Sequence, residues 1–449
     1  MCVPERISPT SITEERPVSQ KPSALSGRRY SADCLAPEDA WLDSWPSKAE
    51  AFKEDMRRLG NELRAAQGQA DVAHLHKIVR WQRLCTFVGL GTCWLGINPV
   101  SIYLLSLGCM TRWTIVAHHV CHGGFDKCSQ GAYNRFKFGV GSLYRRCVDW
   151  LDWMLVEAWN VEHNQLHHYC LGEVTDPDLV EANFVALRQS ASPLWLKYVL
   201  VGLMSLMWKW FYYAPNTLKA LKLHELRREG KTWREAAGAR DAPESDLTAP
   251  WVIHPSWLGR RGAVFFTLLD FFGRVLGPFF VLRFVLAPLP FAALGGRAAY
   301  LNALGSLVLA ELLTNAHSFL NIVSNHAGDD LYRFARHCKP RSATFYLRQI
   351  VSSANFDCGT DLIDFMHGFL NYQVEHHLWP DLSMKSYQKA QPMIQALCKK
   401  HNVPYIKENV FKRLWVLTKI MVGTDSMRKY PNKYEYAPDI VADEPAAAH

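Results

Sequence analysis

The sequence predicts an all-α integral membrane protein with about four transmembrane helices in two hairpins, interfacial helices and a cytosolic helical cap. Two apolar regions carry this prediction. Residues 84–111 contain no charged side chain, and their length exceeds the roughly 20 residues of one bilayer span. Residues 263–324 form the second apolar region. The mean hydropathy of the chain is near zero, so a substantial polar part must complete the protein.

Each apolar region is expected to fold back on itself. Asn98-Pro99 interrupts the first region, and proline breaks helices because it lacks a backbone N–H. A hairpin over 84–117 is therefore predicted, with one long tilted span as the alternative. Residues 263–294 carry Asp270, Arg274 and Arg283 and make a poor span alone, whereas 300–323 make a better one. Together they predict a second hairpin over 263–324.

Other segments are expected to lie at the membrane surface or in the cap. Residues 193–213 are apolar but contain Lys197 and Lys209. Because the basic segment 216–262 prefers the cytosolic side, we favour an interfacial position for 193–213 over a full span. Apolar periodicity predicts amphipathic helices at 48–70, at 142–160, and in KSYQKAQPMIQALCKKH and ENVFKRLWVLTKIM near the C-terminus.

The predicted organisation has a main domain between two tails. The N-terminal tail, 1–47, is rich in Pro, Ser, Arg and Glu and lacks apolar periodicity, so we expect it to be disordered. The predicted main domain is 48–430, and the predicted C-terminal tail is 431–449. Within the main domain we expect membrane hairpins at 84–117 and 263–324 and a cytosolic cap made of 118–192 and 325–430.

Charge and cysteine usage narrow the class of protein. The formal net charge is +8, and the Lys and Arg residues are spread through loops, which does not favour nucleic-acid binding. A basic cytosolic face near anionic lipid fits this pattern better. None of the twelve cysteines forms a C-x2-C pair, so we expect buried thiols rather than a disulfide framework or a zinc ribbon.

Three histidine clusters follow one repeated pattern. They read H-x3-H at 118–122, H-x3-HH at 163–168 and Q-x2-HH at 373–377. Neutral imidazole is the commonest side-chain metal ligand, and residues four apart share one helix face. We expect His168 to point away from the face of His163 and His167, so that one helix serves two metals.

The number of histidines predicts two metal ions. The candidate ligands are His118, His122, His163, His167, His168, His376 and His377. Seven nitrogens are too many for one tetrahedral zinc, and two metals bridged by an oxygen species fit them better. Histidine ligation with carboxylates nearby favours iron and oxygen chemistry, although the ligand type alone leaves zinc and copper open. Glu162, Asp176, Asp178 and Glu375 are candidates to orient the ligands.

With these clusters in this order, residues 80–425 resemble the membrane fatty acid desaturase family. The resemblance is most specific at NYQVEHHLWP, residues 371–380, which is similar to the front-end (delta-5/delta-6-like) branch with Gln373 opening the third cluster. The segment TNAHSFLNIVSNH, residues 314–326, is similar to a family segment that ends in a metal-facing histidine. This implies His326 as an eighth ligand, with His317 as a weaker candidate.

The family resemblance implies an enzyme that introduces a cis double bond into an acyl chain. It implies a non-haem centre of two iron ions, dioxygen as co-substrate and electrons from outside. No HPGG haem motif occurs in the sequence, so we expect a separate electron donor, either cytochrome b5 or a ferredoxin. The implied substrate is an acyl-CoA or a glycerolipid. We favour the endoplasmic reticulum membrane, with a plastid membrane as the alternative.

The chain departs from the family pattern at two clusters. His119 stands second in the first cluster where the family commonly has Asp, so His119 joins Gln373 as a further candidate ligand. The second cluster has three residues before its doublet where front-end members usually have two. A related lipid hydroxylase or ketolase is the alternative enzyme. A metal transporter is disfavoured because the clusters adjoin span ends, whereas a transporter needs ionisable residues along several spans.

Overall fold

The computed structural model describes residues 37–231 and 269–441. The chain divides into two units, Met1–Ala40 and Trp41–His449, and the elements from α1 onward lie in the second unit. Most of the described elements are helical, as the sequence predicts. Of the predicted N-terminal tail 1–47, residues 1–36 lie outside the described residues. The 3-10 helix η1 (Pro37–Ser44) precedes α1 (Trp45–Ala65), which begins three residues earlier than expected.

The first predicted hairpin consists of α2 (Gln69–Thr92) and α3 (Pro99–Met110). The Asn98 side chain accepts a hydrogen bond from the Ser101 amide at 2.8 Å and caps α3, with Pro99 at its first position. The predicted helix break is therefore confirmed. The two helices pack closely, because a Cβ on Gly108 would meet Thr86 Oγ1 at 2.4 Å. The chain then continues through the π-helix η2 (Thr111–Ala117) into α4 (His118–Cys121).

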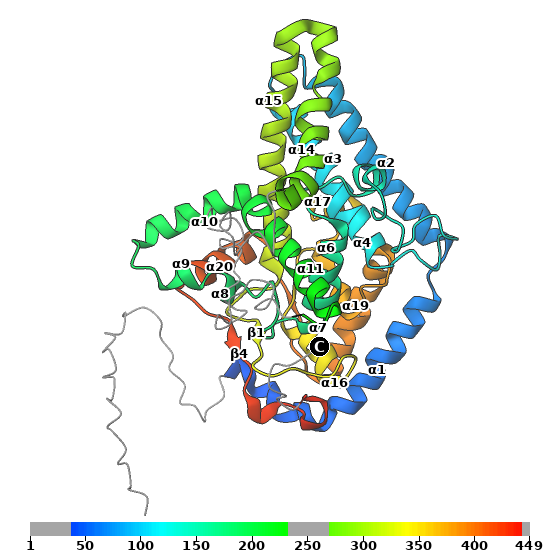
Figure 1. Ribbon diagram of the computed structural model, residues 1–449. Coiled ribbons are helices and arrows are strands. Elements are labelled where there is room, and N and C mark those ends of the chain that lie inside the picture. Colours follow the sequence, from blue (N-terminus) through cyan, green and yellow to red (C-terminus); the bar gives the residue numbers. More distant parts are fainter. Residues whose placement is uncertain (1–36, 232–268, 442–449) are drawn as a thin grey trace, which may run out of the picture. The chain divides into compact units, whose positions relative to one another are not determined.

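The second apolar region also forms two antiparallel helical arms. The first described arm contains η9 (Leu269–Leu276), α14 (Gly277–Phe280) and η10 (Val281–Leu286). The next helix, α15 (Leu289–Ile322), has non-helical backbone at Gly295 and Gly296. The φ of Gly296 is +65°, a value that L side chains rarely adopt. The reversal lies at this glycine pair, and α15 packs beside α3 (Figure 1) and η10.

Two helical stretches in the described part are long and apolar enough to cross a membrane, Pro99–Cys121 and Leu289–Asn325. Large apolar side chains project outward from both hairpins. Phe87 is 77% exposed on α2, and Leu294 is 67% exposed near the tip of α15. Exposed apolar patches of this kind mark surfaces that contact a membrane or another protein.

The segment between the hairpins folds into helices at the side of the cap. These are α8 (Val180–Asn183), α9 (Val185–Gln189), α10 (Leu194–Trp208), the π-helix η5 (Lys209–Tyr213) and α11 (Ala214–Arg228). The helix α10 packs against α15 and α20 and exposes Trp195, Val199 and Leu203.

The single amphipathic helix expected over 142–160 is wrong. The chain forms α5 (Leu143–Arg145), η3 (Arg146–Trp150) and α6 (Val156–Trp159), with non-helical residues between the last two. Leu151 adopts a left-handed conformation with φ of 50°. The break places Asp152 in a buried ion pair with Lys209 at 2.6 Å. A tertiary ion pair has therefore overridden the local helical pattern.

The remaining elements complete the cap. The two amphipathic helices predicted near the C-terminus are confirmed as α19 (Met384–His401) and α20 (Val410–Val422). The helix α1 packs on α16 and α19, and α18 packs on α16. The other cap helices are η4 (Asn160–His167), α7 (His168–Cys170), η11 (Val323–Asn325), α16 (Ala343–Val351), α17 (Asp361–Met366), η12 (Leu370–Tyr372) and α18 (Gln373–Leu378). The described part of the predicted C-terminal tail forms the 3-10 helices η13 (Asn432–Tyr434) and η14 (Ala437–Asp439).

Short strands tie distant cap segments together. β1 (Tyr332–Arg333) pairs in parallel with β4 (Arg428–Lys429), with Tyr332 opposite Arg428. β2 (Ala354–Asn355) pairs in parallel with β3 (Ile406–Lys407), with Ala354 opposite Ile406. The cysteines of the described part are free, as expected.

Candidate metal centre

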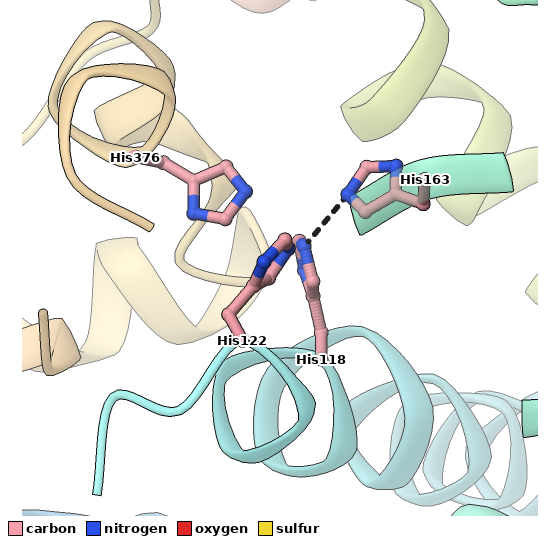
Figure 2. Close-up of side chains that lie close together, drawn as sticks. All are labelled: His118, His122, His163 and His376. Atoms are coloured by element: carbon pink, nitrogen blue, oxygen red, sulfur yellow. Dashed lines mark hydrogen bonds between the residues drawn. The ribbon is translucent and has the colours of Figure 1, made fainter. Parts of the chain in front are cut away.

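Four chain segments bring the predicted histidines together. The first cluster lies at the end of the helix that continues α3, and the second lies on η4 and α7. His326 follows the turn η11, and the third cluster lies on α18. In Figure 2 the rings of His118, His122, His163 and His376 point toward one another from three of these segments.

The first group contains His118, His122, His163 and His376. One ring nitrogen from each lies within 4.8 Å of those of the others, and all four side chains are buried. The Nε2 atoms of His118 and His163 are 3.3 Å apart. Four nitrogens converging on one point form a ligand set of the kind that holds a first-row transition metal.

The second group contains His167, His326 and His377, whose ring nitrogens also lie within 4.8 Å of one another. The Nε2 atoms of His326 and His377 are 3.2 Å apart. His168 lies between the groups: its Nε2 is 3.3 Å from His163 Nε2, and its ring stacks on His377 with centroids 4.3 Å apart.

The expectation that His168 points away from His163 is wrong. The reason is local, because η4 is a π-helix and not an α-helix. In a π-helix, hydrogen bonds join residues five apart, so His168 lies beside His163. Single-turn π segments occur frequently at functional sites, and η2, which leads into the first cluster, is another.

The weaker candidates lie at different distances from the two groups. His119 Nδ1 is 2.7 Å from the Ile115 carbonyl, and His119 belongs to neither group. Gln373 Nε2 lies 2.7 Å from His326 Nε2, at the edge of the second group. His317 Nε2 is 2.8 Å from the Met366 carbonyl oxygen, so His317 is engaged elsewhere.

Neighbouring oxygens orient several rings by holding Nδ1. His118 Nδ1 lies 3.1 Å from the Thr114 carbonyl, and His167 Nδ1 lies 2.8 Å from Asp176. His377 Nδ1 donates to Gln349 at 3.1 Å. A proton on Nδ1 leaves the Nε2 lone pair facing the centre, which is the usual arrangement around metal-bound histidines.

The proposed orienting carboxylates differ in what they contact. Asp176 touches a ring directly, whereas Glu375 bonds Asn355 at 2.7 Å and Tyr405 at 2.8 Å and so anchors α18 to β2. Neither carboxylate oxygen of Glu162 has a hydrogen-bond partner among the described residues. Sequence reasoning missed Gln349, because nothing in the sequence distinguishes it from its polar neighbour Arg348, which is also buried in α16.

Burial and crowding hold most of these imidazoles neutral. Burial, followed by repulsion from neighbouring histidines, lowers the pKa of His122, His163 and His376 well below the usual value. Burial also lowers the pKa of His167, but the charge and hydrogen bond of Asp176 outweigh it and the pKa is raised. Neutral imidazole is the form that binds metal.

Some buried histidine ring nitrogens lack hydrogen-bond partners, and a bound cation fits them. Within the described part of the chain, the Nε2 atoms of His122 and His376 are buried and have no hydrogen-bond partner. Burying a polar atom without a partner costs about 1–3 kcal/mol. Two such lone pairs close to each other are explained by a metal ion that accepts them, and the residues present therefore fit a metal centre.

The family follows from comparison of the sequence with known proteins. Residues 94–409 match the sequence model of a family described as fatty acid desaturase. The chain belongs to the fatty acid desaturase family. The resemblance seen in the histidine clusters is thereby confirmed.

Individual relatives match parts of this desaturase-family chain. It is 28% identical to Delta(5) fatty acid desaturase A of Dictyostelium discoideum over 34% of this chain and 33% of the relative. It is 27% identical to acyl-lipid (7-3)-desaturase of Rebecca salina over 65% of this chain and 56% of the relative. It is 33% identical to NADPH-dependent stearoyl-CoA 9-desaturase of Mycobacterium tuberculosis over 24% of this chain and 26% of the relative.

The chain therefore spans between a quarter and somewhat more than half of the length of these relatives. No solved structure matches it.

Two cavities reach the histidines of this desaturase-family protein. The first, of about 70 Å³, is lined mostly by aromatic and aliphatic side chains and reaches His118, His163 and His167. The second, of about 850 Å³, is lined mostly by polar and charged side chains and reaches His122, His168 and His377. We call them the apolar cavity and the basic hollow.

Proposed function

We propose that this protein is an oxygen-dependent fatty acyl desaturase that introduces a cis double bond into an acyl chain at a non-haem di-iron centre. The observation that carries the proposal is the convergence of buried, mostly neutral histidines into two adjacent groups in a chain of this family. The relatives that the chain matches are named for fatty acid, acyl-lipid and stearoyl-CoA desaturation.

In this proposal the two histidine groups hold one iron each. The first iron is held by His118, His122, His163 and His376 and the second by His167, His326 and His377, with His168 placed between them. Gln373 and His119 are further candidates, and the 2.7 Å approach of Gln373 to His326 favours Gln373. When bound, the irons supply the activation of dioxygen needed to remove hydrogen from an unactivated methylene.

The apolar cavity is proposed to hold the part of the acyl chain that lies against the histidines. Trp113, Trp208 and Phe319 line it, and each is buried. The Trp208 indole donates to the Asn315 carbonyl oxygen at 2.9 Å, which fixes the wall on α15. A mostly apolar wall limits the access of water to the reacting carbon. The proposed substrate is an acyl-CoA or a glycerolipid.

The protein is proposed to be embedded in the membrane by four transmembrane helices in two hairpins, with the cap on the cytosolic side. The exposed apolar side chains on both hairpins support this arrangement. The helix α10 is proposed to lie in the interface, because it exposes an apolar face while Lys197 is buried. We favour the endoplasmic reticulum over a plastid membrane.

Desaturation needs electrons from outside the acyl chain. Removing two hydrogens while reducing one dioxygen to two waters requires two further electrons and two protons. A separate cytochrome b5 or a ferredoxin is the proposed donor.

Expression in yeast tests the proposal. Fatty-acid profiling with double-bond localisation should show a new double bond at unchanged oxygen content, and metal analysis of the purified protein should find two irons per chain. A product with an added oxygen would show a hydroxylase or ketolase instead. Zinc in place of iron would exclude oxygen chemistry.

A further inference from the structure

The basic hollow opens onto the metal centre from a different side than the apolar cavity. We propose that the hollow is the docking surface of an acidic one-electron carrier protein that reduces the centre. This inference rests on the proposed function, because only a reaction that consumes external electrons needs such a surface.

The first support is charge. Five cationic side chains line the hollow against a single carboxylate, Asp381. Two of the cations, Arg57 and Arg64, lie on α1. Lys127 and Arg135 lie in the loop after the first histidine cluster, and Arg341 precedes α16. Cations gathered from three segments of the chain produce a positive field, which steers an acidic partner toward the histidines.

The second support is that only some of these cations are already paired with carboxylates of the protein. Arg64 makes two bonds to Asp381 at 2.7 and 2.8 Å, and Arg135 bonds Asp126 at 2.6 Å. Within the described residues, neither Lys127 nor Arg341 forms a salt bridge, and both are exposed. The hollow is wide, at about 850 Å³, and part of its charge is already engaged. Such a surface suits a protein with spread carboxylates better than one small phosphate group.

The third support is the presence of exposed aromatic side chains among the lining residues. Phe136 is 76% exposed and Tyr169 is 43% exposed. Protein interfaces combine charged rims with such aromatic contacts, and complexes between redox partners are typically small and weak.

The fourth support is the path from the surface to the metal ligands. Tyr169 directly follows His168, and His168 stacks on His377 at 4.3 Å. Both histidines line the hollow. A carrier seated there places its cofactor opposite these two rings. The carrier transfers one electron in each of two successive encounters, and its cofactor undergoes a one-electron oxidation each time.

Charge reversal tests the inference with the purified full-length enzyme in lipid nanodiscs. Reduced haem domain of cytochrome b5 and reduced [2Fe–2S] ferredoxin serve as acidic probes, and their reoxidation is followed during turnover. Lys127→Glu with Arg341→Glu should raise the probe concentration at half-maximal rate by about tenfold or more and flatten its salt dependence. Under anaerobic conditions, the rate at which dithionite-reduced methyl viologen reduces the centre should stay at the wild-type rate.

Lys389→Glu with Lys399→Glu is the matched control, because both lysines are exposed on α19 and neither lines the hollow. It should leave both rates unchanged. The inference is overturned if the double variant responds to the probes like the wild type. It is equally overturned if the KM for the acyl substrate rises instead, which would show that the cations bind an anionic headgroup. Absence of product with every reductant in the wild type would refute the proposed function itself.

Discussion

The apolar cavity and the basic hollow end at the same histidine cluster but differ in almost every other property. The apolar cavity is narrow and walled by tryptophan, phenylalanine and aliphatic side chains, whereas the basic hollow is about 850 Å³ and lined by five cations. The histidines thus lie between a mostly apolar space and a mostly polar one. In the proposed function, electrons would reach the centre from the polar side, while apolar walls would surround the reacting carbon.

The largest effect should come from removing the ring at the meeting point of the two groups. His163 Nε2 lies 3.3 Å from both His118 and His168. His163→Ala should lower bound iron and product formation by more than the roughly 10–100-fold that supporting residues contribute. Iron content and fatty-acid profiling measure this. His317→Ala is the control, because His317 bonds the Met366 carbonyl instead, and it should retain iron.

The next largest effect should come from the carboxylate behind His167. Asp176→Asn removes the charge that holds His167 Nδ1 at 2.8 Å, so iron retention against a chelator should fall about 10–100-fold. Asp178→Asn should have a smaller effect, because that carboxylate lies 3.8 Å away. Equal retention in the Asp176→Asn variant and the wild type would show that Asp176 does not support a ligand.

A smaller and more selective effect is expected from the wall of the apolar cavity. Met204 on α10 lines this cavity, whereas its neighbour Leu203 is 49% exposed. Met204→Trp should shift product formation toward shorter acyl chains, with a loss of roughly fourfold for each methylene that no longer fits. Competition between acyl chains of different length measures the shift. Leu203→Trp should leave chain-length preference unchanged, and the same preference in both variants would contradict the acyl assignment.

The smallest effect is expected in the basic hollow. Asp381→Asn removes its single carboxylate, so the acidic probes should bind a few times more tightly at low salt. Titration of the two probes at low and high ionic strength measures this. Loss of the half-buried pair with Arg64 should cost about 1 kcal/mol of stability. Weaker probe binding would contradict the electrostatic view of the hollow.

The pH dependence of the same pair has a definite sign. Burial raises the pKa of Asp381, but the hydrogen bonds and charge of Arg64 outweigh it, so its folded-state pKa is lowered. The pair therefore stabilises the fold fully above the unfolded-state pKa of about 3.9, and this contribution is lost as the pH falls through the lower folded-state pKa. In the Asp381→Asn variant this part of the acid sensitivity of unfolding should disappear.

Local patterns predicted the elements better than their breaks. Asn98-Pro99 marks the end of a helix because proline chemistry acts within a few residues. The break at Leu151 had no such signal, since the buried partner of Asp152 is Lys209, 57 residues away. The orientation of His168 was also mispredicted, because periodicity arguments assume an α-helix and the cluster lies on a π-helix.

The sequence by itself determined the membrane-like helical hairpins, the family and the residue types gathered at the centre, because apolar runs and spaced histidines are properties of short segments. The tertiary structure alone decided which histidines form each group and that His317 is excluded from both. It also decided that one cluster of rings faces two unlike cavities. These features depend on the packing of α4, η4, η11 and α18, and packing is set by contacts between residues hundreds of positions apart.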